Sequence, residues 1–495
     1  MTHRHLLLIP LLCLGLATTA CSRSRGGGGA DDDDDDAAAS GPLVKGLSIT
    51  NVALYQGVRI DLVDDGDEVF DSEPVDVIAG RDGMIRVSVT TGTDWESRTV
   101  AAVVKLDVDG QSESFSAENS ISGATSDSSL SNSLNVDIPG EFMTRDTSLV
   151  SVKLVEIEDD PPDSGNSSGA TWEADSGLLD LNARDTGASV RIVLVPIEYN
   201  GDGSGRLPDL SDAQLAVYED LLYAQYPTRS VEIVVGDTLS LNYQIQAFGQ
   251  GWGEALNEIY NRRESENAAF EEYYYGIFSP AGSFAEYCQQ GCIAGLSSLA
   301  TEASASWARV SMGLGFSGEG SAETMVHEIG HAHGREHSPC GVNDAGYYPH
   351  GGADIGVQGY DMVNGTLKNT GSFTDFMGYC DPTWVSDYTY NWLFDRISEV
   401  NGEAEYVAPP GFTPRWSTAL VGMDGLKRGS EHTLMMPPGG EKQDVQFLDA
   451  DGQIIETVAG SFHGYSHLAG GRLMFPTPGD KIAAVRLESG ETLPW

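Results

Sequence analysis

Eleven residues, 327–337, constrain the fold more than any other part of this 495-residue chain. They read His-Glu-Ile-Gly-His-Ala-His-Gly-Arg-Glu-His. His327 and His331 are four residues apart, so a helix would project both imidazoles from one face, a spacing that suits one zinc ion. Gly334 can take the positive φ that ends a helix, and the turn would bring back His337 as a third ligand. The segment therefore predicts a metal-binding helix followed by a sharp turn.

The same helix has a second functional residue and a packing face. Glu328 adjoins the first histidine, where its carboxylate can take a proton from a water molecule at the fourth tetrahedral position. The opposite side of the helix is apolar, and Ser321 is the expected N-cap. The positions expected to pack are Ala322, Met325, Val326, Ile329 and Ala332. One face of this helix is thus predicted to pack and the other to bind metal.

A methionine-containing turn lies downstream of the histidines. The pattern His-Glu-x-x-His-x-x-Gly-x-x-His together with such a turn resembles the metzincin clan of zinc endopeptidases. The turn is Asp375-Phe-Met-Gly-Tyr379, with Met377 in the place of the clan's methionine. The resemblance implies one catalytic zinc ion and a general-base role for Glu328. It also implies that Tyr379 ligates zinc or stabilises the oxyanion, a role that varies within the clan.

The cysteines extend this resemblance. In an exported bacterial subgroup of the clan, one cysteine follows the third histidine and another follows the methionine turn, as Cys340 and Cys380 do here. Cys288 and Cys292 are the remaining candidates for a disulfide, and of three possible pairings we favour 288–292 with 340–380. The second bond would close a loop of about 40 residues and contribute roughly 4 kcal/mol in the chain-entropy model. A four-cysteine zinc site is the alternative, but the spacing does not suit it.

The N-terminus predicts export. Residues 1–20 contain an apolar run too short to span a bilayer, followed by small residues before Cys21. This junction resembles the bacterial lipoprotein signal and implies lipidation of Cys21, with ordinary secretion as the alternative. Residues 21–42 predict an extended Gly/Asp-rich tether. The run Asp31–Asp36 could also be read as a Ca²⁺ site, but it lacks the spacing of a calcium loop. We expect the bacterial cell envelope, with the chain lipid-anchored at the outer membrane or surface, or otherwise secreted.

Hydrophobic periodicity divides the rest of the chain into three domains. Residues 43–188 alternate between apolar and polar positions, with a hairpin turn at Asp109-Gly110, and predict an all-β sandwich. Residues 189–406 predict an α/β (α+β) domain that carries the metal motif, and the resemblance implies that this domain is metzincin-like. Residues 407–495 return to alternation and predict a small β-sandwich. The second domain is expected to begin with strands at 190–197 and 231–235 and helices at 211–226 and 253–263.

Charge limits the possible partners. The chain has 74 Asp and Glu against 28 Lys and Arg, a formal net charge of −46. Such a chain repels phosphate backbones and anionic lipid, and no localised basic patch offsets this repulsion. Nucleic acid is therefore not expected as a partner, and membrane contact is expected only through a lipid anchor at Cys21. The expected partner of this monomer is a protein or glycoprotein substrate.

The function predicted from these features is zinc-dependent hydrolysis of peptide bonds in extracellular proteins or glycoproteins. The substrate backbone is expected to pair with an edge strand near 308–312. The alternative is a cell-surface adhesion or binding protein with a non-catalytic zinc site, and a zinc hydrolase acting on a non-peptide bond also stays open. Because no cysteine lies between Cys21 and Cys288, latency by an N-terminal thiolate is not expected, whereas an Asp-based switch or no zymogen at all remains possible.

The other candidate ligands receive structural interpretations. Glu336 could be the third ligand of a different zinc-protease architecture, but His337 fits the short turn better. His333 should lie on the packed side of the helix. His350, His463 and His467 lie in loop or hairpin regions and are expected to be structural.

Overall fold

The computed structural model describes residues 38–70, 75–163, 165–187, 189–343, 345–402, 415–423, 425–434 and 438–495. From Ala38 to Trp495 the chain forms one compact unit. The fold is mixed and mostly β, with five α-helices among several sheets in these described ranges. The predicted export signal and Cys21 lie outside them. None of the described helices is both long and apolar enough to cross a membrane.

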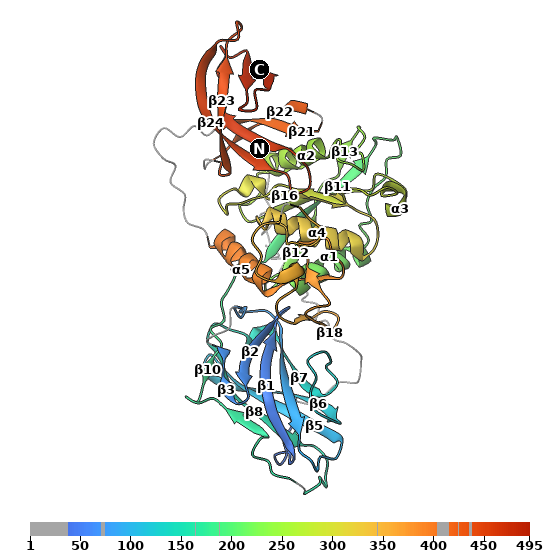
Figure 1. The fold of residues 1–495 in the computed structure, drawn as a ribbon, viewed down its shortest axis with the longest axis vertical. Coiled ribbons are helices and arrows are strands. Elements are labelled where there is room, and N and C mark those ends of the chain that lie inside the picture. Colours follow the sequence, from blue (N-terminus) through green and yellow to red (C-terminus); the bar gives the residue numbers. More distant parts are fainter. Residues whose placement is uncertain are drawn as a thin grey trace, which may run out of the picture. The chain divides into compact units, whose positions relative to one another are not determined.

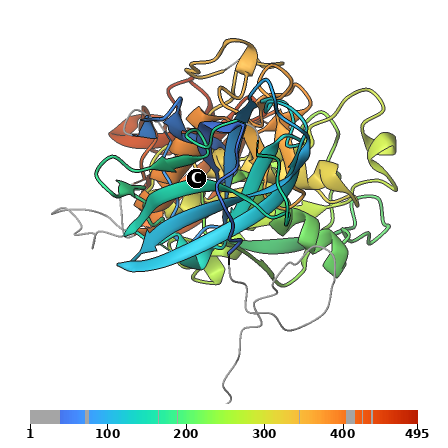
Figure 2. The same cartoon turned by 90° about the horizontal axis from the view of Figure 1, so that it is seen from below.

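The N-terminal part contains two antiparallel sheets that share one core. One sheet has the order β3-β2-β1-β4-β7 and the other β10-β8-β5-β6, with β9 alongside β8 (Figures 1 and 2). The predicted Asp109-Gly110 hairpin joins β5 to β6, and both turn residues have positive φ, 52° and 78°. These features agree with a sandwich. The strands are β1 (Leu47–Tyr55), β2 (Arg59–Asp64), β3 (Asp67–Glu68), β4 (Gly83–Thr91), β5 (Arg98–Val108), β6 (Gln111–Ile121), β7 (Ser133–Ile138), β8 (Thr147–Glu156), β9 (Thr171–Glu173) and β10 (Leu179–Asp180).

The central part is a mainly parallel sheet covered by helices on both faces. Its order is β12-β11-β14-β16-β15, with β13 also beside β11, and only β15 is antiparallel. Along β11, Ile192 and Leu194 belong to the cluster that includes α1 (Asp212–Gln225) and α4 (Glu319–Ala332), whereas Val193 and Val195 belong to the cluster of α2 (Trp252–Ser265). The strands are β11 (Val190–Tyr199), β12 (Val231–Val235), β13 (Leu239–Leu241), β14 (Tyr273–Phe278), β15 (Gly295–Ser297) and β16 (Val310–Leu314).

Two helices of this part, those expected at 211–226 and 253–263, begin within one residue of the predicted positions. The helices are α1 (Asp212–Gln225), α2 (Trp252–Ser265), α3 (Phe284–Tyr287), α4 (Glu319–Ala332) and α5 (Asp387–Asn401). Ser211 caps α1, since its Oγ accepts a hydrogen bond from the Gln214 amide at 3.4 Å. The predicted cap of α4 is wrong, because α4 begins earlier, after Gly318. Ser321 lies inside the helix and uses its hydroxyl for bonds to Tyr218 and to the Gly318 carbonyl.

The predicted edge strand is also wrong. Val310–Met312 belongs to β16, which lies between β14 and β15. The strand at this side of the sheet is β15, which is only three residues long and has too weak a pattern to be recognised from sequence. Two short ladders lie between α4 and α5 in the sequence, β17 (Gly359–Asp361) with β18 (Thr366–Lys368) and β19 (Thr374–Asp375) with β20 (Thr383–Trp384).

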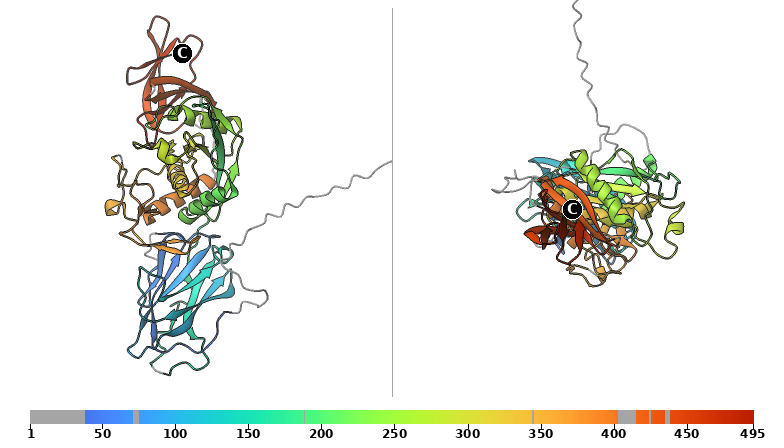
Figure 3. Two further views of the ribbon diagram at one scale, coloured as in Figure 1. Left: turned by 90° about the vertical axis from the view of Figure 1, so that its right-hand side faces the viewer. Right: turned by 90° about the horizontal axis from the view of Figure 1, so that it is seen from above.

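The C-terminal part is a single seven-stranded sheet in the order β22-β21-β25-β24-β23-β26-β27, where two stacked sheets were expected. Its strands curve, and the end strands approach each other to form a near-barrel (Figures 1 and 3). Arg428 of β22 stacks on Trp495 beyond β27. Long β24 pairs with both β23 and β25, and a Cβ at Gly460 would lie 2.8 Å from Val445 in the core. The strands are β21 (Arg415–Gly422), β22 (Gly425–Thr433), β23 (Glu441–Leu448), β24 (Ile454–Gly464), β25 (Gly471–Pro476), β26 (Ala484–Arg486) and β27 (Thr492–Pro494).

Candidate metal centre

Helix α4 carries three of the predicted site residues, and all of them are buried. His327, Glu328 and His331 have exposed fractions of 8%, 2% and 1%. The helix can approach the methionine turn closely because residue 330 is glycine. A Cβ at Gly330 would lie 2.5 Å from the sulfur of Met377, which is itself fully buried. Met377 therefore packs directly against the turn of α4 between the two histidines.

Gly334 ends this segment as predicted. Its φ is +96°, and a Cβ there would lie 2.2 Å from the Ala300 carbonyl oxygen, so the position requires glycine on two grounds. The Gly334 amide donates to the His331 carbonyl at 2.7 Å, and the Arg335 amide donates to the Gly330 carbonyl at 2.9 Å. The reversal brings His337 back to the two helical histidines, with 4% of its surface exposed.

The three predicted histidines point their Nε2 atoms at one another. The Nε2 atom of His331 lies 3.1 Å from that of His327 and 3.2 Å from that of His337. Three nitrogens bound to one zinc ion at tetrahedral positions lie about 3.3 Å apart. The spacing of the donor atoms therefore fits a single metal ion.

The protonation of these rings also fits a metal. The Nδ1 atom of His327 lies 2.7 Å from the Phe376 carbonyl oxygen, and that of His331 lies 2.6 Å from the Arg335 carbonyl oxygen. Since a carbonyl only accepts, each Nδ1 carries the proton and each Nε2 presents a lone pair. Burial lowers the pKa of His327 to about 4 and that of His331 well below its usual value, so both rings are neutral at pH 7. Converging lone pairs repel each other unless a cation lies between them.

Glu328 directs its carboxylate into the same site. Its Oε2 accepts a hydrogen bond from Ser466 Oγ at 3.2 Å, and its Oε1 lies 2.7 Å from His467 Nε2. Gly295 of β15 leaves space for this side chain, because a Cβ there would lie 2.4 Å from Oε1. Burial raises the pKa of Glu328 to about 7, which suits a group that must both accept and return a proton near neutral pH.

A fourth histidine joins the cluster, one for which the sequence predicted a structural role. His467 lies in the turn between β24 and β25, and its ligand atom and those of the three predicted histidines all lie within 4.8 Å of one another. Its ring centroid is 5.0–5.2 Å from each of the other three. The buried four-histidine group could hold a metal ion. His467 is 130 positions beyond His337, so no local spacing could have revealed it.

Tyr379 also lies at this cluster. Its hydroxyl is 3.2 Å from His337 Nε2 and forms a hydrogen bond with His467 Nδ1, while half of the residue is exposed. The phenol is thus at the solvent-facing side of the four histidines. Tyr379 thus contacts two of the four histidines, and its predicted role at the metal stays a prediction.

The methionine turn is fixed by a buried carboxylate. Asp375 is fully buried and accepts hydrogen bonds from Ser338 Oγ at 2.7 Å, the Met377 amide at 3.0 Å, Ser386 Oγ at 2.6 Å and the Ser386 amide at 3.2 Å. The Ser338 amide in turn donates to the Met377 carbonyl at 3.0 Å. The segment after His337 is therefore held against the turn by a satisfied polar network.

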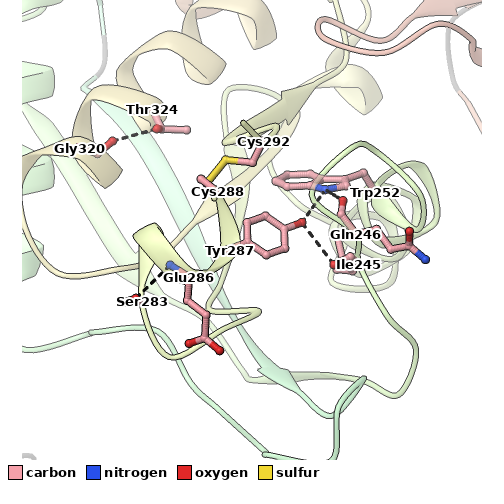
Figure 4. Close-up of a disulfide and its surroundings, with 10 residues drawn as sticks. All are labelled: Ile245, Gln246, Trp252, Ser283, Glu286, Tyr287, Cys288, Cys292, Gly320 and Thr324. Carbon is pink, nitrogen blue, oxygen red and sulfur yellow. Dashed lines mark hydrogen bonds between the residues drawn. A yellow bond between two sulfur atoms is a disulfide. The ribbon is translucent and has the colours of Figure 1, made fainter. Parts of the chain in front are cut away.

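Both predicted disulfides are present. Cys340–Cys380 links the segment after His337 to the residue after Tyr379. Cys288–Cys292 lies just before β15, beside Tyr287, whose hydroxyl donates to the Ile245 carbonyl at 3.3 Å (Figure 4). These bonds are compatible with an extracellular protein.

The other polar candidates lie outside the cluster. Glu336 is exposed, so the alternative third ligand is not part of the group. His333 stacks on Tyr273 with ring centroids 4.2 Å apart, and His350 pairs with Asp387 at 2.6 Å.

No protein-family model matches this chain, and no curated protein matches it either.

Proposed function

We propose that this protein is an exported zinc endopeptidase of metzincin type that cleaves extracellular proteins or glycoproteins. The observation that carries the proposal is the convergence of the three histidine Nε2 atoms beside the buried carboxylate of Glu328. His327, His331 and His337 would hold the ion. When bound, zinc supplies Lewis-acid polarisation of a carbonyl group and lowers the pKa of water.

The protein side chains then have distinct tasks. Glu328 takes a proton from the attacking water and passes it to the leaving amine, a role that its raised pKa supports. Tyr379 can donate its phenolic proton toward an oxyanion, since its hydroxyl lies at the histidine cluster. The hydrogen bonds from Nδ1 of His327 and His331 to carbonyl groups keep those rings oriented.

The substrate backbone would lie along β15. This strand is the last in the central sheet, it is antiparallel, and Gly295 contacts Glu328. An extended peptide that paired with β15 would pass directly beside the carboxylate.

A second function is favoured by one observation. Structural zinc sites are closed by four protein ligands, whereas catalytic sites keep one position open, and His467 supplies a fourth histidine here. The second candidate is therefore a cell-surface binding protein with a non-catalytic zinc ion. In that case Glu328 would have no chemical role.

The deciding experiment compares proteolysis of an unfolded protein by chain 38–495 with that by its Glu328→Gln variant. Because His467 contacts Glu328, both are also tested with His467→Ala. The peptidase proposal predicts cleavage that Glu328→Gln abolishes without loss of bound zinc. The matched control is Glu319→Gln, an exposed position of the same helix, which should retain activity. Zinc-loaded, folded chains that cleave nothing in either background would favour the binding protein.

A further inference from the structure

The edge where a substrate would bind is already paired with another part of the chain. Residues 464–467 run antiparallel to the end of β15 and the residues that follow it. The Ser466 amide donates to the Ser297 carbonyl at 3.0 Å, and the Ser297 amide donates to Ser466 Oγ at 2.9 Å. Tyr465 forms an antiparallel bridge with Ser298. The segment therefore has the backbone position that an added peptide strand would take.

The same segment contacts both side chains to which we assign chemistry. Ser466 Oγ donates to one oxygen of Glu328, and His467 Nε2 lies 2.7 Å from the other. The Nδ1 atom of His467 forms a hydrogen bond with the Tyr379 hydroxyl. With only 11% of its side chain exposed, His467 fills the space where water and a scissile carbonyl would have to enter.

The geometry of the turn prevents this segment from being an ordinary substrate. The Tyr465 amide donates to the Gly470 carbonyl at 3.2 Å, so the chain reverses directly after His467. Gly470 has φ of +109°, and a Cβ there would lie 2.1 Å from the Val421 carbonyl oxygen. A cleavable peptide must extend on both sides of the bond that is broken, whereas this turn extends on one side only.

We infer that residues 464–467 form a built-in inhibitory segment that covers the site until the turn between β24 and β25 moves away. This inference rests on the proposed peptidase function. It supplies a form of latency that needs neither an N-terminal cysteine nor an acidic switch. On release, the His467 imidazole and the Ser466 backbone leave, and water and substrate take their places.

The contacts that hold the turn are of a kind that can be broken without unfolding the central sheet. Tyr465 and Leu468 are only partly buried against the cluster around Trp252. The C-terminal sheet itself is held on α2 by the partly exposed ion pair of Lys427 with Glu254 and by the buried Arg472, which donates to Asn257 Oδ1 at 2.9 Å, so the turn would have to move without the sheet.

The test measures access to the metal separately from activity. Chain 38–495 is loaded with cobalt(II), and its visible spectrum is recorded as acetohydroxamate is added. His467→Ala is the main variant, and Leu468→Ala weakens the contact of the turn while keeping the histidine. Ile455→Ala, exposed at the other end of β24, is the matched control. Proteolysis is measured on the same samples.

We expect the parent and the control to respond weakly to acetohydroxamate and both turn variants to respond at concentrations lower by at least about tenfold, with proteolysis rising by a similar factor. Equal responses of the parent and the variants would overturn the inference. So would a fall in proteolysis in an open His467→Ala site, which would make His467 catalytic. If the turn variants respond to acetohydroxamate but cleave no protein, the inference that residues 464–467 cover the site is supported and the proposed peptidase function is refuted.

Discussion

Substitution of Gly330 by alanine tests how closely Met377 packs against the helix that carries the histidines. Glycine inside a helix normally costs up to about 1 kcal/mol relative to alanine, so Gly330→Ala would be expected to stabilise an isolated helix. In the folded protein the new Cβ would lie 2.5 Å from the Met377 sulfur and 3.3 Å from the Phe376 ring. Ordinary contacts between such atoms begin at about 3.5 Å, so one partner must move by about 1 Å.

The effect of Gly330→Ala on stability is the balance between its gain in helix propensity and the cost of overpacking against Met377. Met377 has no exposed surface and cannot swing into solvent, and overpacking of a buried site costs about 1–3 kcal/mol. The helical gain offsets part of that cost. We therefore expect Gly330→Ala to lower the free energy of unfolding by about 1–2 kcal/mol, where propensity alone predicts an increase.

The assay is urea unfolding of chain 38–495, followed by circular dichroism. Gly320→Ala is the matched control, because it lies in the same helix and its new Cβ would have no neighbour within 4 Å. Gly320→Ala should raise the free energy of unfolding by a few tenths to about 1 kcal/mol. In a Met377→Ala background Gly330→Ala should become neutral or stabilising, since its steric partner is gone. If Gly330→Ala stabilises the unaltered chain as much as the control does, the close packing of Met377 is refuted.

Three further predictions concern the surroundings of the site. Asp375→Asn should lower the free energy of unfolding by about 2–3 kcal/mol and weaken zinc binding, because an amide nitrogen cannot accept the hydrogen bonds that hold the methionine turn. Urea unfolding and zinc titration measure the two effects. Unchanged zinc affinity would contradict this prediction. Cys340→Ser with Cys380→Ser should lower the free energy of unfolding by about 2–4 kcal/mol relative to the oxidised parent, with the reduced parent as the control that should match the variant. Equal stability of the oxidised parent and the variant would rule out this stabilisation. Burial lowers the pKa of His463 to about 4. Between about pH 6.5 and 4 the unfolded chain therefore binds a proton at this residue that the folded chain does not bind. As the pH is lowered through this window, the free energy of unfolding should decrease by up to about 1.4 kcal/mol per pH unit. His463→Phe, which can keep the ring contact with Trp307, should reduce this slope in unfolding curves taken across the window, and an unchanged slope would assign it to other groups.

Short-range patterns in the sequence determined much of the local structure. The β11 and β12 strands, the α1 and α2 helices and the Asp109-Gly110 turn lie where periodicity and turn chemistry predict them, because each depends on neighbouring residues. The three motif histidines come together for the same reason, since helical spacing and one positive-φ glycine are enough to bring them to one point. Both disulfides also match the predicted pairing.

Long-range contacts decided the rest. His467 reaches the cluster because β24 pairs with both β23 and β25, and the turn that follows β24 contacts the end of β15. The spacing of residues along the chain cannot predict this contact. The edge strand was misplaced because three residues carry too little pattern, and the C-terminal sheet curves into one near-barrel where alternation alone cannot distinguish one sheet from two. The three motif histidines could thus be recognised as metal ligands from their spacing, because local geometry brings them together. The fourth histidine could not, because strands far apart in the sequence must pack together before it faces the other three.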